Sequence, residues 1–355
     1  MMSTETTNSR SRAMRQYAGQ GLKFALAGAV AVYLIRRGDI AWEPLRESIR
    51  QWQYSVPAFI LLAMTPLWQF WRWQCLLRAS GVRLPHREVF SYLMFSKFIN
   101  MAFPGYLSGD ILRGFFVSRR AAKNTEGQQE GKEYQAGGTS EVVTSILFDR
   151  LAGIYPLFAL CMIGLIGTLR HPMQPRIMTP VGLLAAAGLL LPAVFVAVAS
   201  RVPEPPGWLL RWSAALHLQN ILASLHSAIH RFARNGKLLG KIIGISFLNQ
   251  SFVLLSFVLF GFALETHVPV TSYLMLVPIG LMVTAIPISP AGLGVGQIAF
   301  LGLFHTVGAS QGANLFTLYM ATYVLINSAG AFLFPMTQSG TQISRRAILA
   351  EIRKN

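Results

Sequence analysis

Residues 287–297 read PISPAGLGVGQ and place two prolines and three glycines inside an otherwise apolar stretch, 271–308. A regular α-helix cannot continue through this stretch, because proline lacks a backbone N–H and both residue types disfavour the helix interior. Non-helical backbone at membrane depth is tolerated only where protein or a wet cavity covers it. We therefore expect a broken hairpin whose backbone is shaped by Pro287, Pro290, Gly292 and Gly294.

A second break lies in the apolar stretch 90–118, where residues 100–113 read NMAFPGYLSGDILR. Pro and Gly stop the first helix there, and Ser108 or Asp110 could cap the next one. A helix start that points into the membrane presents a positive dipole end suited to phosphate. The backbone residues assigned to this hairpin are Asn100, Pro104, Gly105 and Gly109.

The composition of the chain and its apolar runs predict membrane-spanning helices on either side of these two breaks. Hydrophobic residues make up 53% of the 355 residues and charged residues 13%, well below the charged fraction of soluble domains. Apolar runs approach the length that crosses a hydrocarbon core of about 30 Å. We expect an all-α, polytopic membrane protein with about six full transmembrane helices, at 22–35, 55–76, 141–168, 178–200, 242–264 and 314–338.

The basic residues predict the orientation. The formal net charge is +17, but lysine and arginine cluster between apolar runs, which indicates topology rather than nucleic-acid binding. If the N- and C-termini are cytoplasmic, the basic residues of 72–97, 113–132 and 201–241 also lie on the cytoplasmic side. The outside connections then hold only Arg36, Arg37, Arg46, Arg50, Arg170 and Arg176. The two broken hairpins then enter from opposite faces, within two units of inverted topology, an architecture typical of transporters. The alternative is that the breaks are ordinary turns between short full spans.

Around the membrane domain, residues 22–340, we expect a polar cytoplasmic N-terminus at 1–21 and a basic cytoplasmic tail at 341–355. Polar residues at 121–140 predict a flexible cytoplasmic loop. Residues 208–234 carry an apolar stripe at helical spacing, which predicts an amphipathic helix on the inner membrane surface. His226 and His230 have the spacing of metal ligands but lack a third, so no metal site is expected.

Asp149 and Arg150 are the most informative charged residues, because both lie inside the expected span 141–168. Charged side chains at the bilayer centre cost about 2.5–3.5 kcal/mol on insertion scales. Adjacent residues on a helix point in different directions, so each needs a partner elsewhere. Asp110 and Arg113 are the natural partners. The resulting ionic cluster would form the inner mouth of a cavity or, alternatively, a structural lock between elements.

The sequence contains no enzyme motif in the sequence context that the motif requires. Metalloprotease, serine-hydrolase and P-loop motifs are absent. The segment GLGVGQ resembles part of a dinucleotide fingerprint, but no strand or βαβ unit precedes it. We therefore expect neither catalytic activity nor a cofactor.

Three segments resemble the lysylphosphatidylglycerol synthase transmembrane-region family, whose members are also described as flippase-like domain proteins: PGYLSGDILRGFFVSRR (104–120), ILFDRLAGI (146–154) and IPISPAGLGVGQIAF (286–300). The resemblance covers roughly residues 20–340. It implies a protein of the bacterial inner (cytoplasmic) membrane linked to translocation of lipids or polyisoprenoid-linked glycans. Bifunctional members add a cytosolic domain that aminoacylates phosphatidylglycerol, an activity expected to be absent here.

Two residues depart from the family pattern. Ala291 replaces a glycine expected after the second proline, and Gln297 replaces an expected glutamate. Loss of that carboxylate argues against a proton-coupled mechanism that relies on it and leaves a neutral hydrogen-bonding group. The residues to which the resemblance and the charge pattern assign substrate binding are Asp110, Arg113, Asp149, Arg150 and Gln297.

The sequence thus predicts a translocase for an anionic phospholipid or a polyprenyl-phosphate-linked lipid. Its phosphate head would be held by Arg113, Arg150 and helix N-termini while its tails remain in the bilayer. The alternative is a non-transporting accessory protein that recruits a lipid- or glycan-modifying enzyme through its amphipathic helix and basic surface. No nucleic-acid partner is expected.

Overall fold

The computed structural model describes residues 32–33, 36, 42–102, 108–126, 139–168, 175–202, 207, 235–286 and 289–337. These residues form helices and no strand, which confirms the all-α prediction. The elements are α2 (Trp42–Arg50), α3 (Trp52–Ala79), α4 (His86–Ala102), α5 (Ser108–Glu126), α6 (Thr139–Thr168), α7 (Pro175–Ala199), α10 (Gly236–Ala263), α11 (Val270–Thr284), the 3-10 turn η1 (Pro290–Gly292), α12 (Val295–His305), α13 (Gly312–Ser328) and α14 (Gly330–Thr337).

Five of the six expected spans correspond to helices in the described part of the chain. Four segments are long and apolar enough to cross a membrane: Glu141–Thr168, Met178–Val198, Gly236–Ala263 and Gly312–Leu333. The expected span 55–76 lies within α3, a helix of 28 residues. The remaining expected span, 22–35, falls almost entirely outside the described residues.

Both expected breaks separate helices. The first divides α4 from α5, although Pro104 and Gly105 lie outside the described residues. The second divides α11 from α12 through η1, and Pro287 also lies outside the description. In the second break φ is positive at Ala291 (50°), Gly292 (77°) and Gly294 (81°). This conformation is easy for glycine and costly for alanine, since the Cβ atom crowds the following carbonyl.

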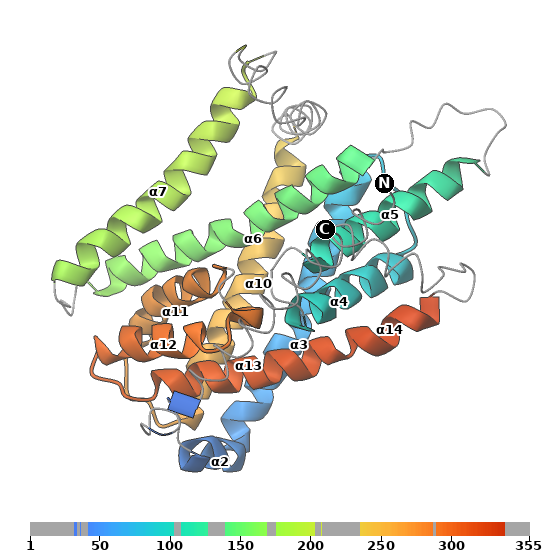
Figure 1. Cartoon of the computed structure of the whole chain (residues 1–355). Coiled ribbons are helices and arrows are strands. Elements are labelled where there is room, and N and C mark those ends of the chain that lie inside the picture. The colour runs from blue at the N-terminus through green and yellow to red at the C-terminus, as the bar shows by residue number, and fades with distance from the viewer. Residues whose placement is uncertain are drawn as a thin grey trace, which may run out of the picture.

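The helices pack as two groups around the contact between α3 and α10 (Figure 1). In the first group, α3, α4, α5 and α6 enclose a core that includes Trp73, Val89 and Phe116. In the second group, α10, α11, α12 and α13 enclose a larger core. Its centre is aromatic: the Phe257 ring stacks on Phe300 at 5.1 Å between centroids and on Tyr319 at 4.6 Å.

Each helix group contributes its last helices to a contact with the second helix of the other group. Helix α6 of the first group packs along α11, while α13 and α14 pack along α4. Glycines allow these helices to come close. A Cβ on Gly164 of α6 would lie 2.5 Å from the Met275 backbone nitrogen of α11, and a Cβ on Gly330 of α14 would meet the Met94 carbonyl oxygen of α4.

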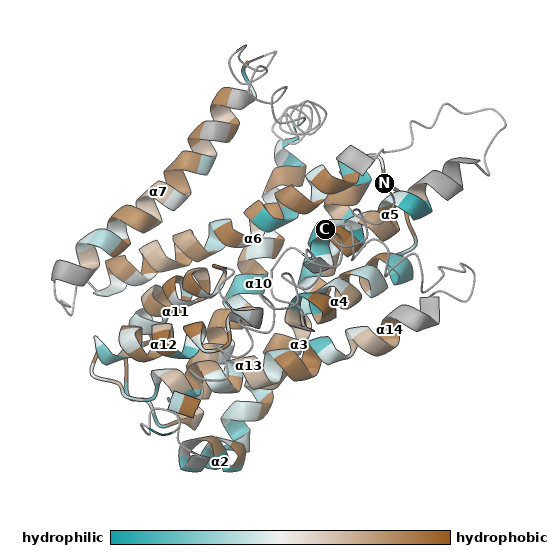
Figure 2. Ribbon diagram, in the orientation of Figure 1, coloured by the Kyte–Doolittle hydropathy of each residue, from teal (hydrophilic) through white to brown (hydrophobic). Residues whose placement is uncertain are grey.

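Helix α7 contacts α6 near the end at which the chain passes from α6 to α7 and then diverges from the rest of the molecule (Figure 1). Figure 2 shows it mostly in the brown of apolar residues, and Leu183, Leu190 and Leu191 are exposed on it. A membrane-embedded helix presents such a surface to lipid, because acyl chains are as apolar as leucine.

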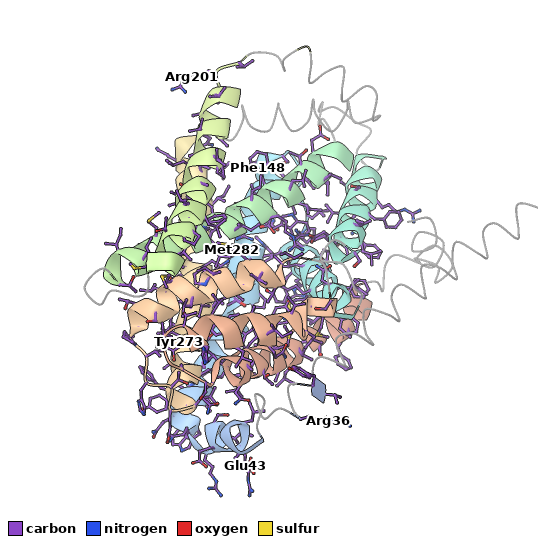
Figure 3. All side chains as sticks on the ribbon, turned by 60° about the vertical axis from the view of Figure 1, so that its left-hand side comes forward. Arg36, Glu43, Phe148, Arg201, Tyr273 and Met282 are labelled. Carbon is purple, nitrogen blue, oxygen red and sulfur yellow. The ribbon has the colours of Figure 1, made fainter. Side chains whose placement is uncertain are left out.

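The described connections lie at opposite ends of the molecule. Figure 3 places Arg201, which follows α7, at one end and Arg36 and Glu43 at the other. The predicted topology assigns Arg201 to the cytoplasmic side and Arg36 to the opposite side. Which of these two ends faces the cytoplasm stays a prediction.

One predicted segment needs correction. Residues 121–126 belong to α5 and residues 139–140 to α6, so these two ends of the expected loop at 121–140 are helical. The rest of that segment up to residue 138, the expected amphipathic helix at 208–234, and the termini at 1–21 and 341–355 lie outside the described residues.

Candidate functional site

Asp149 of α6 lies between two arginines in the interior of the first helix group. Its Oδ1 accepts a hydrogen bond from Arg72 Nε at 2.7 Å, and its Oδ2 accepts one from Arg113 Nη2 at 3.3 Å. Asp149 and Arg72 are each 5% exposed, and Arg113 is 2% exposed. Burial of this depth requires pairing, because an isolated charge in an apolar interior is far too costly.

Asp110 of α5 is the second carboxylate and also joins two arginines. Its Oδ1 lies 2.9 Å from Arg113 Nε, and its Oδ2 accepts a hydrogen bond from Arg150 Nε at 2.6 Å. Arg150 Nη2 lies close to the same oxygen. The predicted partnership is therefore crossed: Asp149 pairs with Arg113 and Arg150 pairs with Asp110, since neighbouring residues on α6 face different sides.

These five residues form what we call the arginine cluster: Arg72, Asp110, Arg113, Asp149 and Arg150. Its members come from α3, α5 and α6, three helices of the first group. Three guanidinium groups face two carboxylates, so the cluster carries an excess of positive charge. The Arg150 side chain is the open member at 36% exposure, whereas the Asp110 side chain beneath it is 5% exposed.

Aromatic and small polar groups hold the arginines in place. The Arg113 guanidinium lies 4.5 Å from the Trp73 ring centroid, and the indole N–H of Trp73 donates to Ser145 Oγ at 3.4 Å. Arg72 Nη1 donates to Ser246 Oγ of α10 at 3.1 Å. A guanidinium over an indole ring gains cation–π attraction, so Trp73 helps to hold Arg113 in position.

Arg72 is the member that sequence reasoning missed. Arg72 and Arg113 are both buried, so their side chains form ion pairs inside the helix group rather than facing solvent. The available signal was position: Arg72 lies within the expected span 55–76, where a charged residue requires a partner just as Asp149 does.

The first hairpin positions Asp110 through its own polar residues. Asn100 of α4 accepts a hydrogen bond from the Gly109 N–H at 2.8 Å and so satisfies a backbone donor at the start of α5. A Cβ on Gly109 would meet the Ser96 carbonyl oxygen, so only glycine lets α5 approach α4 this closely. Ser96 Oγ donates to Asp110 Oδ1 at 3.4 Å. Asp110 is thus an ion-pair residue in the first turn of α5.

The second hairpin does not join the arginine cluster. Gln297 is buried, and its Oε1 accepts a hydrogen bond from the Gly294 N–H at 2.7 Å, which caps the start of α12. Within the described residues, no hydrogen bond or ion pair links Gln297 to the cluster. The role of Gln297 in substrate binding stays a prediction. The η1 turn itself packs against α4, so the two hairpins touch.

Nearer the predicted cytoplasmic side, Arg120 of α5 forms a paired bridge with Glu88 of α4. Its Nε and Nη2 each lie 3.0 Å from a carboxylate oxygen. This hydrogen-bonded carboxylate raises the pKa of Arg120. The bridge fastens the outer ends of α4 and α5. The described residues contain no group of three or more His, Cys, Asp or Glu that could hold a metal ion.

One family model covers most of the chain. The model of the lysylphosphatidylglycerol synthase TM region matches residues 21–329. The chain belongs to this family. The match covers α2 to α13 and every residue of the arginine cluster. Neither a curated protein nor a solved structure matches the chain.

Membership in this family makes the chain a multi-pass membrane protein of a lipid-related family, and the apolar helices agree with that assignment. The resemblance drawn from the three sequence segments is thereby confirmed.

Proposed function

We propose that the protein translocates a lipid with a phosphate-bearing head across the bacterial inner membrane. The observation that carries this proposal is the arginine cluster: buried guanidinium groups in excess over carboxylates, with Arg150 open at one side. Guanidinium groups bind phosphate through charge-assisted, often bidentate hydrogen bonds. A cluster with surplus positive charge at membrane depth favours an anion.

The packing supports a transporter architecture. The contacts of α6 on α11 and of α13–α14 on α4 are equivalent when α3, α4, α5 and α6 correspond to α10, α11, α12 and α13. That correspondence is the one expected for an inverted repeat, in which a substrate site lies between broken helices near the midplane. We propose that the two units move against each other while the lipid tails stay in the bilayer.

In the proposed mechanism the carboxylates compete with the substrate. Asp110 and Asp149 neutralise the arginines when the site is empty, as their present ion pairs do. A phosphate head would first meet Arg150, the exposed member, and draw it away from Asp110. This is an exchange of one charge-assisted pair for another, so it needs no uncompensated charge. The proposal includes no catalytic step and no cofactor, and it keeps both termini cytoplasmic.

The second candidate is an accessory protein that recruits a lipid- or glycan-modifying enzyme. The exposed apolar side of α7 favours it, because that helix has room for a partner in the membrane. The arginine cluster is better explained by transport, since a docking protein has no need for buried excess charge.

The test is translocation in liposomes. Purified protein is reconstituted with trace phosphatidylglycerol bearing a fluorophore on one tail, or with fluorescent polyprenyl phosphate, and a membrane-impermeant quencher is added. Without translocation about half of the fluorescence is protected. We expect the protected fraction to fall with time in protein-containing liposomes.

Two controls are needed: empty liposomes, and liposomes containing an unrelated helical membrane protein at the same density. A folded protein that moves neither lipid faster than these controls would contradict the proposal. Co-purification with a lipid-modifying enzyme would then favour the accessory role.

A further inference from the structure

Lys97 of α4 is a largely buried lysine that takes no part in the ion pairs of the arginine cluster. Its Nζ lies 5.6 Å from the ring centroid of Tyr323 on α13. Among the residues that the structure describes, no carboxylate lies within ion-pair distance of it. A single cation–π contact offsets only part of the loss of hydration of a buried ammonium group. Within the described part of the chain, Lys97 therefore has no carboxylate as a counter-ion.

The surroundings of Lys97 are positive. The charges that act on it are those of Arg150, Arg113 and Arg72, opposed by Asp149. Both carboxylates of the cluster are already shared between two arginines each. With its proton in place, Lys97 raises the excess of the cluster from one positive charge to two.

Lys97 and Arg150 also share a neighbour. Tyr323 lies beneath the Lys97 ammonium and within electrostatic range of Arg150. These three residues come from α4, α6 and α13, so both helix groups contribute to the surroundings of Lys97 and Arg150. An anion seated there would contact both groups of helices.

We propose that Lys97 and Arg150 together seat a head with two negative charges, that is, a phosphomonoester or a pyrophosphate-linked lipid. This inference rests on the proposed function and names its substrate class. A phosphodiester such as phosphatidylglycerol carries one negative charge and neutralises only half of the excess of two positive charges. A phosphomonoester neutralises both, and Tyr323 fixes the ammonium group for it.

The test compares two lipids with the same tails. Native mass spectrometry of the detergent-purified protein, titrated at pH 7, gives the apparent Kd for dioleoyl phosphatidic acid and for dioleoyl phosphatidylglycerol. We expect wild type to bind phosphatidic acid at least about 10-fold more tightly, which corresponds to one additional partly buried ion pair. Lys97→Met should reduce that ratio to about 1–2 with little change for phosphatidylglycerol, and Lys97→Arg should keep it.

Arg119→Gln is the matched control, because Arg119 is exposed on α5 over the Phe115 ring and should leave both affinities unchanged. Equal binding of the two lipids by wild type would overturn the inference and leave translocation of monoanionic lipids intact. A ratio that survives in Lys97→Met would remove Lys97 from the site.

Competition by glycerol 3-phosphate, the same head without tails, separates the two sources of phosphate. Weak displacement supports a lipid, and complete displacement at equal concentration would overturn the lipid assignment.

Discussion

Asp149→Asn provides the strictest test of the arginine cluster as a connected unit. The substitution keeps the shape of the side chain and removes one buried negative charge shared by Arg72 and Arg113. Arg113 retains Asp110 at 2.9 Å, whereas among the described residues Arg72 retains only the Ser246 hydroxyl at 3.1 Å. The loss therefore falls mainly on Arg72, which is 5% exposed.

Breaking a buried ion pair on one side costs about 3–5 kcal/mol, because the remaining charge stays buried. Arg113 keeps a partner, and the amide oxygen of the new asparagine can still accept a hydrogen bond. We therefore expect the free energy of unfolding to fall by an amount near the lower limit, about 3 kcal/mol. The double variant Arg72→Gln/Asp149→Asn removes the stranded charge. It should lose less than the sum of the two single variants, with a coupling energy of about 1–3 kcal/mol.

The assay is reversible unfolding in mixed micelles with an increasing fraction of sodium dodecyl sulfate, followed by tryptophan fluorescence. Glu141→Gln makes the same neutralising change in the first turn of the same helix, outside the cluster, and should cost less than about 1 kcal/mol. If Asp149→Asn is no more destabilising than Glu141→Gln, the cluster is not the buried network described here.

Two further predictions concern the backbone. Ala291→Gly should stabilise the protein by about 0.5–1 kcal/mol, because Ala291 has a φ of 50° and glycine relieves the crowding of its Cβ; a loss of stability in the same unfolding assay would contradict this conformation. Gly164→Ala should destabilise the contact of α6 with α11 by about 1–3 kcal/mol, since its Cβ would lie 2.5 Å from the Met275 nitrogen. Gly244→Ala, with nothing within 4 Å of the added Cβ, is its control and should be neutral or gain up to about 1 kcal/mol; equal effects of the two would refute the close packing.

Much of the fold could be predicted because the bilayer limits the choices. An apolar run of sufficient length becomes a spanning helix, and the expected spans 141–168 and 242–264 coincide closely with α6 and α10. The breaks at 100–113 and 287–297 could be predicted because proline and glycine act through local backbone chemistry. The extension of α5 through residue 126 could not, since polar residues are common both in solvent-facing helices and in loops.

The candidate site was predicted in part for the same kind of reason. Asp149 and Arg150 were identified because charge inside an apolar span requires a partner, and Asp110 and Arg113 were the nearest choices. Which residue pairs with which depends on helix rotation and on Arg72 of another helix, and no sequence spacing determines either. The sequence places Lys97 among the basic residues of the cytoplasmic side. Its contact with Tyr323 could not be predicted, because it joins residues far apart in the chain.

The most direct test of the central claim is the initial rate of anionic-lipid translocation for Arg150→Gln against wild type, at equal amounts of folded protein in matched liposomes. Because the Arg150 side chain is 36% exposed, the variant should fold. The account predicts that its rate falls to that of empty liposomes, that Arg150→Lys recovers part of the rate, and that Arg119→Gln equals wild type. Wild-type translocation by Arg150→Gln would contradict the account, and the cluster would then be a structural lock between helices.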